Sequence, residues 1–351
     1  MAMLLPYRLQ FVPATALAGI LKIVAILGLL SSTVCAQCRE KTVPPTAGAP
    51  KPKLYVLMSE RLFSAINRTD AAAALKIWGE LVTCLQHLDV ETKVEMIDTP
   101  QELRQRVINR TAHVLIVDSV EFIALSDAGL VEGAGVASSD GQPLAPAYVL
   151  LVNSQMDSLS QLRGKRAVFY MRTASAASVA WMSILLANQH LGNVEGFFSS
   201  AEISTNPSNC ILPLFFGRID ACVIDSRNWG IAREMNPQLQ TKLKVLTQSV
   251  AVLSGVAAVP KFPIDNRQQV VESLFQIHKY PVGQQILTVF RSGPIIPYRP
   301  EYIESTRQFW TEYERTLSPA QLKQWNLSLL PILPAQSQAA SGAASKMAAV
   351  R

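Results

Sequence analysis

Residues 217–226 (GRIDACVIDS) contain the end of one helix, a buried strand and the start of a second helix. Gly217 suits the turn that ends a helix, and Asp220 leads into the apolar run of residues 221–224. Asp225 and Ser226 follow at the carboxyl end of this strand, where a new helix can begin. A strand enclosed by helices in this way predicts an α/β fold.

Strands and helices alternate on both sides of this stretch. We expect apolar strands at residues 53–58, 94–97, 113–117, 147–153, 166–170, 202–204, 221–224, 244–247 and 249–259. We expect helices at residues 70–88, 99–109, 119–125, 173–191, 208–216, 226–235, 266–278, 283–289, 300–317 and 319–327, with a helical turn at 159–164. This order predicts mostly parallel sheets joined by right-handed crossovers.

The order also divides the chain into two lobes. Extended segments near residues 147–152 and 251–259 would carry the chain to the second lobe and back. We therefore assign residues 54–147 and 251–332 to lobe 1 and residues 148–250 to lobe 2. Two mostly parallel sheets joined by two hinge strands would enclose a ligand cleft at the carboxyl ends of their strands.

The N-terminus reads as an export signal. Arg8 and Lys22 precede an apolar run at residues 23–30 (IVAILGLL), and small residues at 34–36 predict cleavage before Gln37. We therefore expect a signal peptide over residues 1–36 and a periplasmic location. The alternative is an uncleaved membrane anchor, although Lys22 interrupts the apolar segment.

Two further segments lie outside the predicted fold. Residues 37–53 are rich in proline and read as a linker between the signal and lobe 1. Residues 333–351 are rich in alanine, serine and glutamine without an apolar period, which predicts a disordered tail.

Composition excludes some functions. The chain has 351 residues, a net charge of +6 and only 17% charged residues, and its lysines and arginines are scattered. This pattern disfavours nucleic-acid binding.

Four cysteines remain after the expected cleavage. Cys210 and Cys222 are the pair to test for a disulfide, although two buried free thiols are the alternative.

No compact catalytic or metal motif is present. The four histidines do not stand at ligand spacing from one another or from a cysteine: His87, His113, His190 and His278. We therefore expect no metal, no cofactor and no catalytic residue. A hydrolase or transferase site assembled from distant residues stays the alternative.

Residues 164–175 (GKRAVFYMRTAS) form the strongest candidate anion site. A strand ends here and a helix begins, so unpaired N–H groups and a partial positive charge face outward. Thr173 and Ser175 add hydroxyl donors, and Arg172 adds a cationic fork. The alternative is that Thr173 or Ser175 only caps its own helix.

Three other strand ends carry candidate ligand-binding residues. Asp225 follows residues 221–224, Asp118 and Ser119 follow residues 113–117, and Ser59 follows the first strand. Each lies at the carboxyl end of a strand, where ligand-facing side chains are placed in α/β sheets. Each also stands where a helix cap would serve instead.

The chain resembles the phosphate/phosphite/phosphonate-binding family of ABC-transporter substrate-binding proteins, which have a type II periplasmic-binding fold. The resemblance spans roughly residues 54–330 and is carried by residues 159–169 (LSQLRGKRAVF), 173–175 and 217–226. It implies that Thr173 and Ser175 hold the ligand's oxygens and that Asp225 lies at the ligand. It also implies a small anionic solute, an ABC-transporter permease as partner, and a monomer.

The chain departs from the family pattern at the hydroxyl cluster. Met171 and Arg172 stand in place of Asp-Pro, Ala174 lacks the middle hydroxyl, and Ala176 replaces a glycine. Phosphonate, carboxylate, sulfonate and other solutes all stay open as ligands. A sensing or interaction module of the same fold also stays open, because it would keep the same fold and cleft.

Overall fold

The computed structural model describes residues 53–63, 66–86, 90–265 and 267–329. The predicted signal peptide, all but the last residue of the predicted linker and the predicted tail lie outside these residues. Within the described ranges, every helix is too short or too polar to cross a lipid bilayer.

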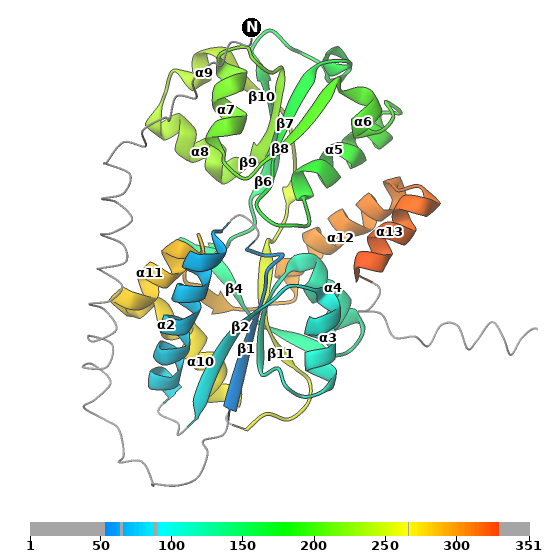
Figure 1. Ribbon diagram of the computed structural model, residues 1–351. Helices are drawn as coiled ribbons and strands as arrows, with labels where there is room; N and C mark the ends of the chain where they lie inside the picture. Colours follow the sequence, from blue (N-terminus) through cyan, green and yellow to red (C-terminus); the bar gives the residue numbers. More distant parts are fainter. Residues whose placement is uncertain (1–52, 64–65, 87–89, 266, 330–351) are drawn as a thin grey trace, which may run out of the picture.

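The described chain forms two α/β lobes (Figure 1). Lobe 1 contains a seven-stranded sheet of order β12-β4-β11-β3-β1-β2, in which β5 pairs with β4. Its strands are β1 (Lys53–Ser59), β2 (Glu91–Ile97), β3 (Val114–Asp118), β4 (Val131–Ser139), β5 (Gln142–Pro143), β11 (Gly255–Pro260) and β12 (Ile295–Pro297). Lobe 2 contains a five-stranded sheet of order β10-β6-β9-β7-β8. Its strands are β6 (Ala147–Asn153), β7 (Arg166–Tyr170), β8 (Ser200–Ser204), β9 (Ala221–Asp225) and β10 (Leu243–Ala251).

Helices cover both faces of each sheet, because successive side chains of a buried strand point to opposite sides. In lobe 1, Val56 and Met58 of β1 pack with α2 (Arg68–Gln86), α10 (Arg267–Gln276) and α11 (Pro281–Val289). Leu57 packs on the other side, with α3 (Pro100–Ile108) and α4 (Ser119–Asp127). A short helix, η3 (Ile277–Lys279), links α10 to α11.

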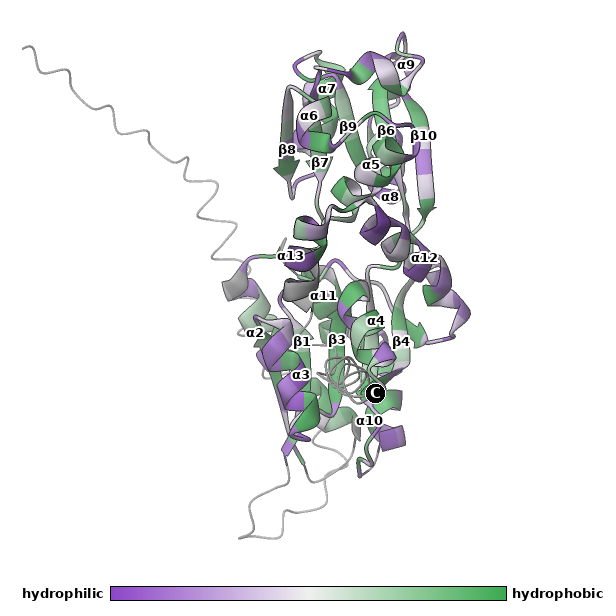
Figure 2. Ribbon diagram, turned by 90° about the vertical axis from the view of Figure 1, so that its right-hand side faces the viewer, coloured by the Kyte–Doolittle hydropathy of each residue, from purple (hydrophilic) through white to green (hydrophobic). Residues whose placement is uncertain are grey.

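Lobe 2 is layered in the same way. One face carries α5 (Ala177–Asn188), α6 (Val194–Phe197) and η2 (Leu159–Leu162), and the other carries α7 (Ser208–Phe215), α8 (Ser226–Met235) and α9 (Leu239–Lys242). In Figure 2 the strands between these helices are mostly hydrophobic, as expected for a sheet buried on both sides.

Both sheets are mixed, which corrects the expectation that they are mostly parallel. Parallel pairing is confined to β2-β1-β3 and to β8-β7-β9. The strands next to the crossings, β11 and β4 in lobe 1 and β6 and β10 in lobe 2, pair antiparallel. The reason is that a strand carrying the chain back from the other lobe enters its sheet from the opposite end.

The two crossings are shorter than expected. The chain leaves lobe 1 after β5 and returns between β10 and β11, so the expected strand at 249–259 is two strands with a break. At this point the N–H of Val252 donates to the carbonyl of Pro146 over 3.2 Å, which ties one crossing to the other. Gly255 follows the break, and a Cβ there would lie 2.6 Å from the carbonyl oxygen of Val117.

Helix α12 (Glu301–Thr316) joins the lobes from outside, and α13 (Pro319–Leu329) follows it (Figure 1). Ile303 packs into the core of lobe 1, whereas Phe309 and Trp310 pack into the core of lobe 2. A hydrogen bond of 2.8 Å runs from the N–H of Leu253, in the return crossing, to Thr306 Oγ1. Helix α12 therefore belongs to both cores.

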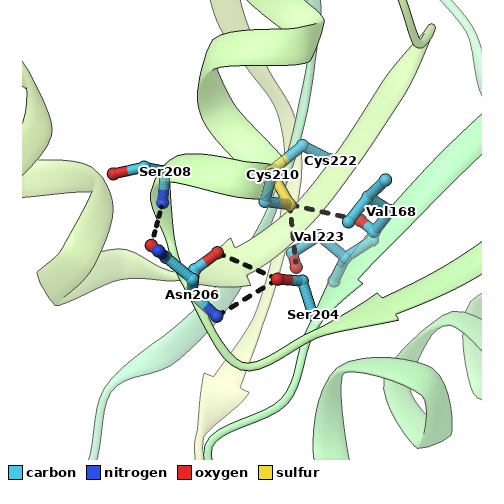
Figure 3. The surroundings of a disulfide bond; sticks show 7 residues. All are labelled: Val168, Ser204, Asn206, Ser208, Cys210, Cys222 and Val223. Carbon is cyan, nitrogen blue, oxygen red and sulfur yellow. Dashed lines mark hydrogen bonds between the residues drawn. A yellow bond between two sulfur atoms is a disulfide. The ribbon is translucent and has the colours of Figure 1, made fainter. Parts of the chain in front are cut away.

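A disulfide joins Cys210 of α7 to Cys222 of β9 (Figure 3). It settles the alternative between a bridge and two free thiols in favour of the bridge. Both residues are fully buried, and the bond fixes α7 against the sheet of lobe 2. Cys84, in α2, is disulfide-bonded as well.

Candidate functional site

The hydroxyl cluster lies in the connection between β7 and α5, where lobe 2 meets lobe 1. Helix α5 begins at Ala177 rather than at residue 173, and its N-cap, Ala176, has a left-handed φ of 51°. The N-cap side chain makes no capping hydrogen bond. Thr173 and Ser175 therefore do not cap the helix, and their hydroxyls are used elsewhere.

Ser175 contacts a carboxylate of the other lobe. Its Oγ donates to Asp118 Oδ2 over 2.8 Å, and Thr173 Oγ1 lies 3.3 Å from Ser175 Oγ. The N–H of Ala174 donates to the carbonyl of Arg61, again in lobe 1, over 2.8 Å. Little of these side chains is exposed: 6% of Thr173, 5% of Ser175 and 0% of Asp118. The segment between β7 and α5 is therefore buried against lobe 1.

Asp118 is held in place by its own helix. It is the N-cap of α4, and its Oδ1 accepts a hydrogen bond of 2.8 Å from the N–H of Glu121. Glu121 completes a capping box by accepting from the N–H of Asp118 over 3.1 Å. Ser59 Oγ donates to Glu121 Oε1 over 2.8 Å, and Arg61 Nε lies 3.5 Å from Asp118 Oδ2.

The carboxyl group of Glu121, beside Asp118, has a strongly shifted pKa. Burial, and next the negative charge of Asp118, raise the pKa of Glu121 to about 8, against the opposing effects of Ser59 and Arg61. At neutral pH the Glu121 carboxyl is therefore mostly protonated. The guanidinium of Arg61 faces both carboxyl groups, with its Nε 3.5 Å from Asp118 Oδ2 and 3.9 Å from Glu121 Oε1.

The remaining strand-end candidates have structural partners. Ser119 Oγ accepts a hydrogen bond of 3.3 Å from Trp310 Nε1 of α12. Asp225 is the N-cap of α8, and it accepts from the N–H and the Nδ2 of Asn228 over 2.8 and 2.6 Å. Asp225 is 1% exposed, and its charge contributes to raising the pKa of nearby Tyr170, after burial as the larger cause.

Arg172 lines a cavity between the lobes. Its Nη2 donates to the carbonyl of Arg291, in lobe 1, over 2.9 Å. The cavity has a volume of about 80 Å³, and lobe 2 contributes Tyr170 and Arg172 to its lining. Lobe 1 contributes Arg291, Ser254 and Ser292 together with a mostly apolar wall. In the described part of the chain, no acidic side chain lines this cavity.

The structure thus separates the sequence candidates into three groups. Ser59, Asp118, Thr173 and Ser175 meet in one buried network across the lobes. Ser119 and Asp225 lie at helix starts outside that network. Arg172 lines the cavity.

The sequence analysis did not predict three residues that belong to the site. Glu121 had a usable signal, since Asp118 and Glu121 have capping-box spacing. Arg61 and Arg291 had none, because they reach the site from loops whose placement depends on the whole fold. Among the described residues, no three histidine, cysteine or acidic side chains converge as a metal site.

Two α/β lobes joined by two crossings, with a cavity between them, define a solute-binding protein of the two-lobed periplasmic kind. The sequence profile of the family described as "ABC transporter, phosphonate, periplasmic substrate-binding protein" matches residues 63–302. The chain belongs to this family, which confirms the resemblance seen in the sequence. A search among curated proteins finds no match.

Solved structures support the fold. A Xanthomonas citri protein bound to chloride is 14% identical with a TM-score of 0.54, over 75% of this chain and 98% of that chain. The binding component of an ABC phosphonate transporter from Pseudomonas aeruginosa is 12% identical with a TM-score of 0.52, over 81% and 97%. PhnD1 from Prochlorococcus marinus, in complex with methylphosphonate, is 14% identical with a TM-score of 0.50, over 74% and 97%. At these identities the likeness shows the fold, which is the type II periplasmic-binding fold.

Proposed function

We propose that this chain is an exported solute-binding protein that captures a small anionic solute between its lobes. The observation that carries the proposal is the pair Arg172 and Arg291, which line one inter-lobe cavity from opposite lobes. Neither guanidinium forms an ion pair with a carboxylate of the described residues. Two such cations suit the oxygens of a phosphonate, sulfonate or carboxylate group.

Closure follows from this placement. A solute held by Arg172 of lobe 2 and Arg291 of lobe 1 has both contacts only when the lobes are together, so its binding favours the closed state. The buried network of Ser59, Asp118, Thr173 and Ser175 would stabilise that closed state. We propose these four as closing residues, whereas Arg172 contacts the solute.

Direct binding of an oxyanion by Thr173 and Ser175 stays a prediction, with one added requirement. Ser175 Oγ carries one proton, and it is donated to Asp118. An oxyanion can receive that hydrogen bond only if the Asp118 carboxylate moves away. Roles at the ligand for Ser59, Asp118, Ser119 and Asp225 likewise stay predictions.

The biological setting of the proposal comes from the family and from residues 1–36. Family membership supports delivery of the solute to the permease of an ABC transporter, and the signal peptide predicted over residues 1–36 supports a periplasmic location. We propose that the protein works as a monomer, without cofactor, catalysis or nucleic acid.

Thermal unfolding in the presence of small anions tests the function. Ligands that bind the native state raise the melting temperature in a saturable way. We expect at least one of phosphate, methylphosphonate, methanesulfonate or acetate to do so, beyond a chloride control of equal ionic strength. The variant Arg172→Met should weaken this effect, whereas Arg315→Met, at a guanidinium that is 72% exposed on α12, should not. Equal stabilisation by a neutral solute such as glycerol would contradict the proposal.

A further inference from the structure

We infer that the solute is an amphiphilic organic anion: an anionic head group attached to an aliphatic or aromatic group of several carbons. This inference rests on the proposed function and adds the chemical class of its ligand. The head group would lie between Arg172 and Arg291, and the hydrocarbon group would fill the part of the cavity that lobe 1 encloses.

The lobe 1 wall of the cavity is aromatic and aliphatic. Phe63, Trp78 and Phe290 line it, and their rings pack on one another with centroids 4.8 Å (Phe63–Phe290) and 5.7 Å (Trp78–Phe290) apart. All three are at most 9% exposed, so the wall is part of a fixed core. Leu62, Ile66, Leu287 and Ile295 extend the same wall.

Such a wall discriminates between ligands. A bare oxyanion placed against it would lose water without gaining a hydrogen bond, which is unfavourable. A hydrocarbon group in the same place gains from leaving water. A cavity of about 80 Å³ is several times the ~10–15 Å³ that one water molecule needs by this measure. It therefore accommodates a group of a few carbon atoms.

The polar end of the cavity is cationic and comes from both lobes. Tyr170 is the last residue of β7, Arg172 lies just after that strand, and Arg291 follows α11 with a left-handed φ of 48°. Glycine is the usual residue at this position after a helix, since other side chains adopt it at a cost. The conformation nevertheless brings the carbonyl of Arg291 within hydrogen-bonding distance of the Arg172 guanidinium, so the two residues meet in the lining of the cavity.

The alternative anion site is already filled by the protein. Asp118 accepts the Ser175 hydroxyl, and the N–H of Ala174 is bonded to Arg61. The Asp118 charge also repels a second anion at that position. Arg172 and Arg291 are therefore the cationic donors left for the head group.

Calorimetric titration with a homologous series tests this inference on the unmodified protein. The series is phosphate, methylphosphonate, butylphosphonate and phenylphosphonate, with butanol as the neutral control. Burying one methylene strengthens binding about three- to fourfold, so butylphosphonate should bind at least about tenfold more tightly than methylphosphonate. Butanol should show no saturable binding.

The outcomes separate the inference from the function on which it rests. If phosphate or methylphosphonate binds as tightly as butylphosphonate, the amphiphilic class is wrong and anion binding stands. If no member of the series binds, the inference fails, and the proposed function fails with it only if methanesulfonate and acetate also leave the melting temperature unchanged. Tight butanol binding would also overturn the inference, because the head group would then contribute nothing.

Variants locate the two ends of the ligand. Leu62→Gln changes a half-buried wall residue, and it should bring the affinity ratio of butylphosphonate to methylphosphonate close to one. Leu212→Gln, at a residue that is 44% exposed on α7, is the matched control and should keep the full ratio. Arg291→Ala should weaken butylphosphonate about tenfold, against Arg315→Ala as control. An unchanged ratio in folded Leu62→Gln would overturn the inference, and the unmodified protein decides the question alone if that variant does not fold.

Discussion

Ser175 of lobe 2 donates a 2.8 Å hydrogen bond to the carboxylate of Asp118 in lobe 1, and both residues are almost fully buried. A carboxylate of the protein thus stands where the sequence predicted a bound anion. The contact joins the lobes directly, and it makes the closing residues and the cavity residues two separate groups with separate tests.

Replacing Asp118 by asparagine should open the hydroxyl cluster to small anions. Asparagine keeps the N-cap of α4 but removes the charge that repels a ligand. We expect the affinity for methanesulfonate, whose charge does not change with pH in this range, to rise about tenfold, or about 1.4 kcal/mol. Calorimetry at about pH 6 checks this, because low pH favours the protonated form of Glu121, whose pKa burial still raises when the Asp118 charge is removed.

The control for that experiment is Asp157→Asn, which removes an exposed charge from lobe 2. Its affinity for methanesulfonate should equal that of the unmodified protein. An Asp118→Asn variant with unchanged or weaker affinity would show that the Asp118 carboxylate does not compete with the ligand.

Glu121 should make the protein less stable as the pH rises. Its pKa is raised from 4.5 to about 8 in the folded protein, chiefly by burial and next by Asp118. Between these values the folded state binds more protons than the unfolded state, so the free energy of unfolding falls with increasing pH. The stability that this group supplies is complete below its unfolded pKa and is lost as the pH passes about 8.

The substitution Glu121→Gln removes this titration while retaining a polar partner for Ser59. In urea unfolding, the unmodified protein should lose stability relative to the variant between about pH 5 and about pH 8, by up to about 1.4 kcal/mol per pH unit. Glu202→Gln, at an exposed carboxyl of β8, is the control and should run parallel to the unmodified protein. Parallel curves for Glu121→Gln would refute the prediction.

Ser175→Ala should weaken the contact between the lobes. It removes a hydrogen bond to a buried carboxylate, a loss of about 1.5–3 kcal/mol. We expect a lower free energy of unfolding and, in small-angle X-ray scattering, a larger radius of gyration without ligand. Ser183→Ala is the matched control, because that hydroxyl bonds within α5 itself. If both variants behave alike, the Ser175–Asp118 contact does not hold the lobes together.

The sequence predicted those parts of the fold that depend on local patterns. The strand before Asp225 and the helix after it lie where the apolar run and the capping residues indicated. Strand β4 was not predicted, because its glycines lower strand propensity. A tertiary contact explains the glycine at position 133, because a Cβ at Gly133 would lie 2.4 Å from the ring of Tyr298.

The candidate site was predicted only in part, for a similar reason. The hydroxyl cluster and the capping aspartates are visible as single residues at strand ends. Their partners are not, because Ser175 and Asp118 stand 57 positions apart and meet only when two lobes come together. Arg291 comes from a helix end far from Arg172 in the chain, and no local pattern marks it.

The disulfide between Cys210 and Cys222 should stabilise lobe 2. It closes a loop of 12 residues, and a bond over such a loop contributes about 2–4 kcal/mol, mainly by restricting the unfolded chain. A double variant, Cys210→Ala with Cys222→Ala, should lose this amount in urea unfolding without reductant.

Reductant alone is a poorer test, because Cys84 is also disulfide-bonded and would be reduced together with this pair. Replacing both buried sulfurs by alanine also leaves space in the core, so the double variant Cys210→Ser with Cys222→Val serves as a check with better-filled volume. Alkylation of the unreduced protein in denaturant, followed by mass spectrometry, should find neither Cys210 nor Cys222 modified. Modification of both would show two free thiols and would contradict the bond and its contribution to stability.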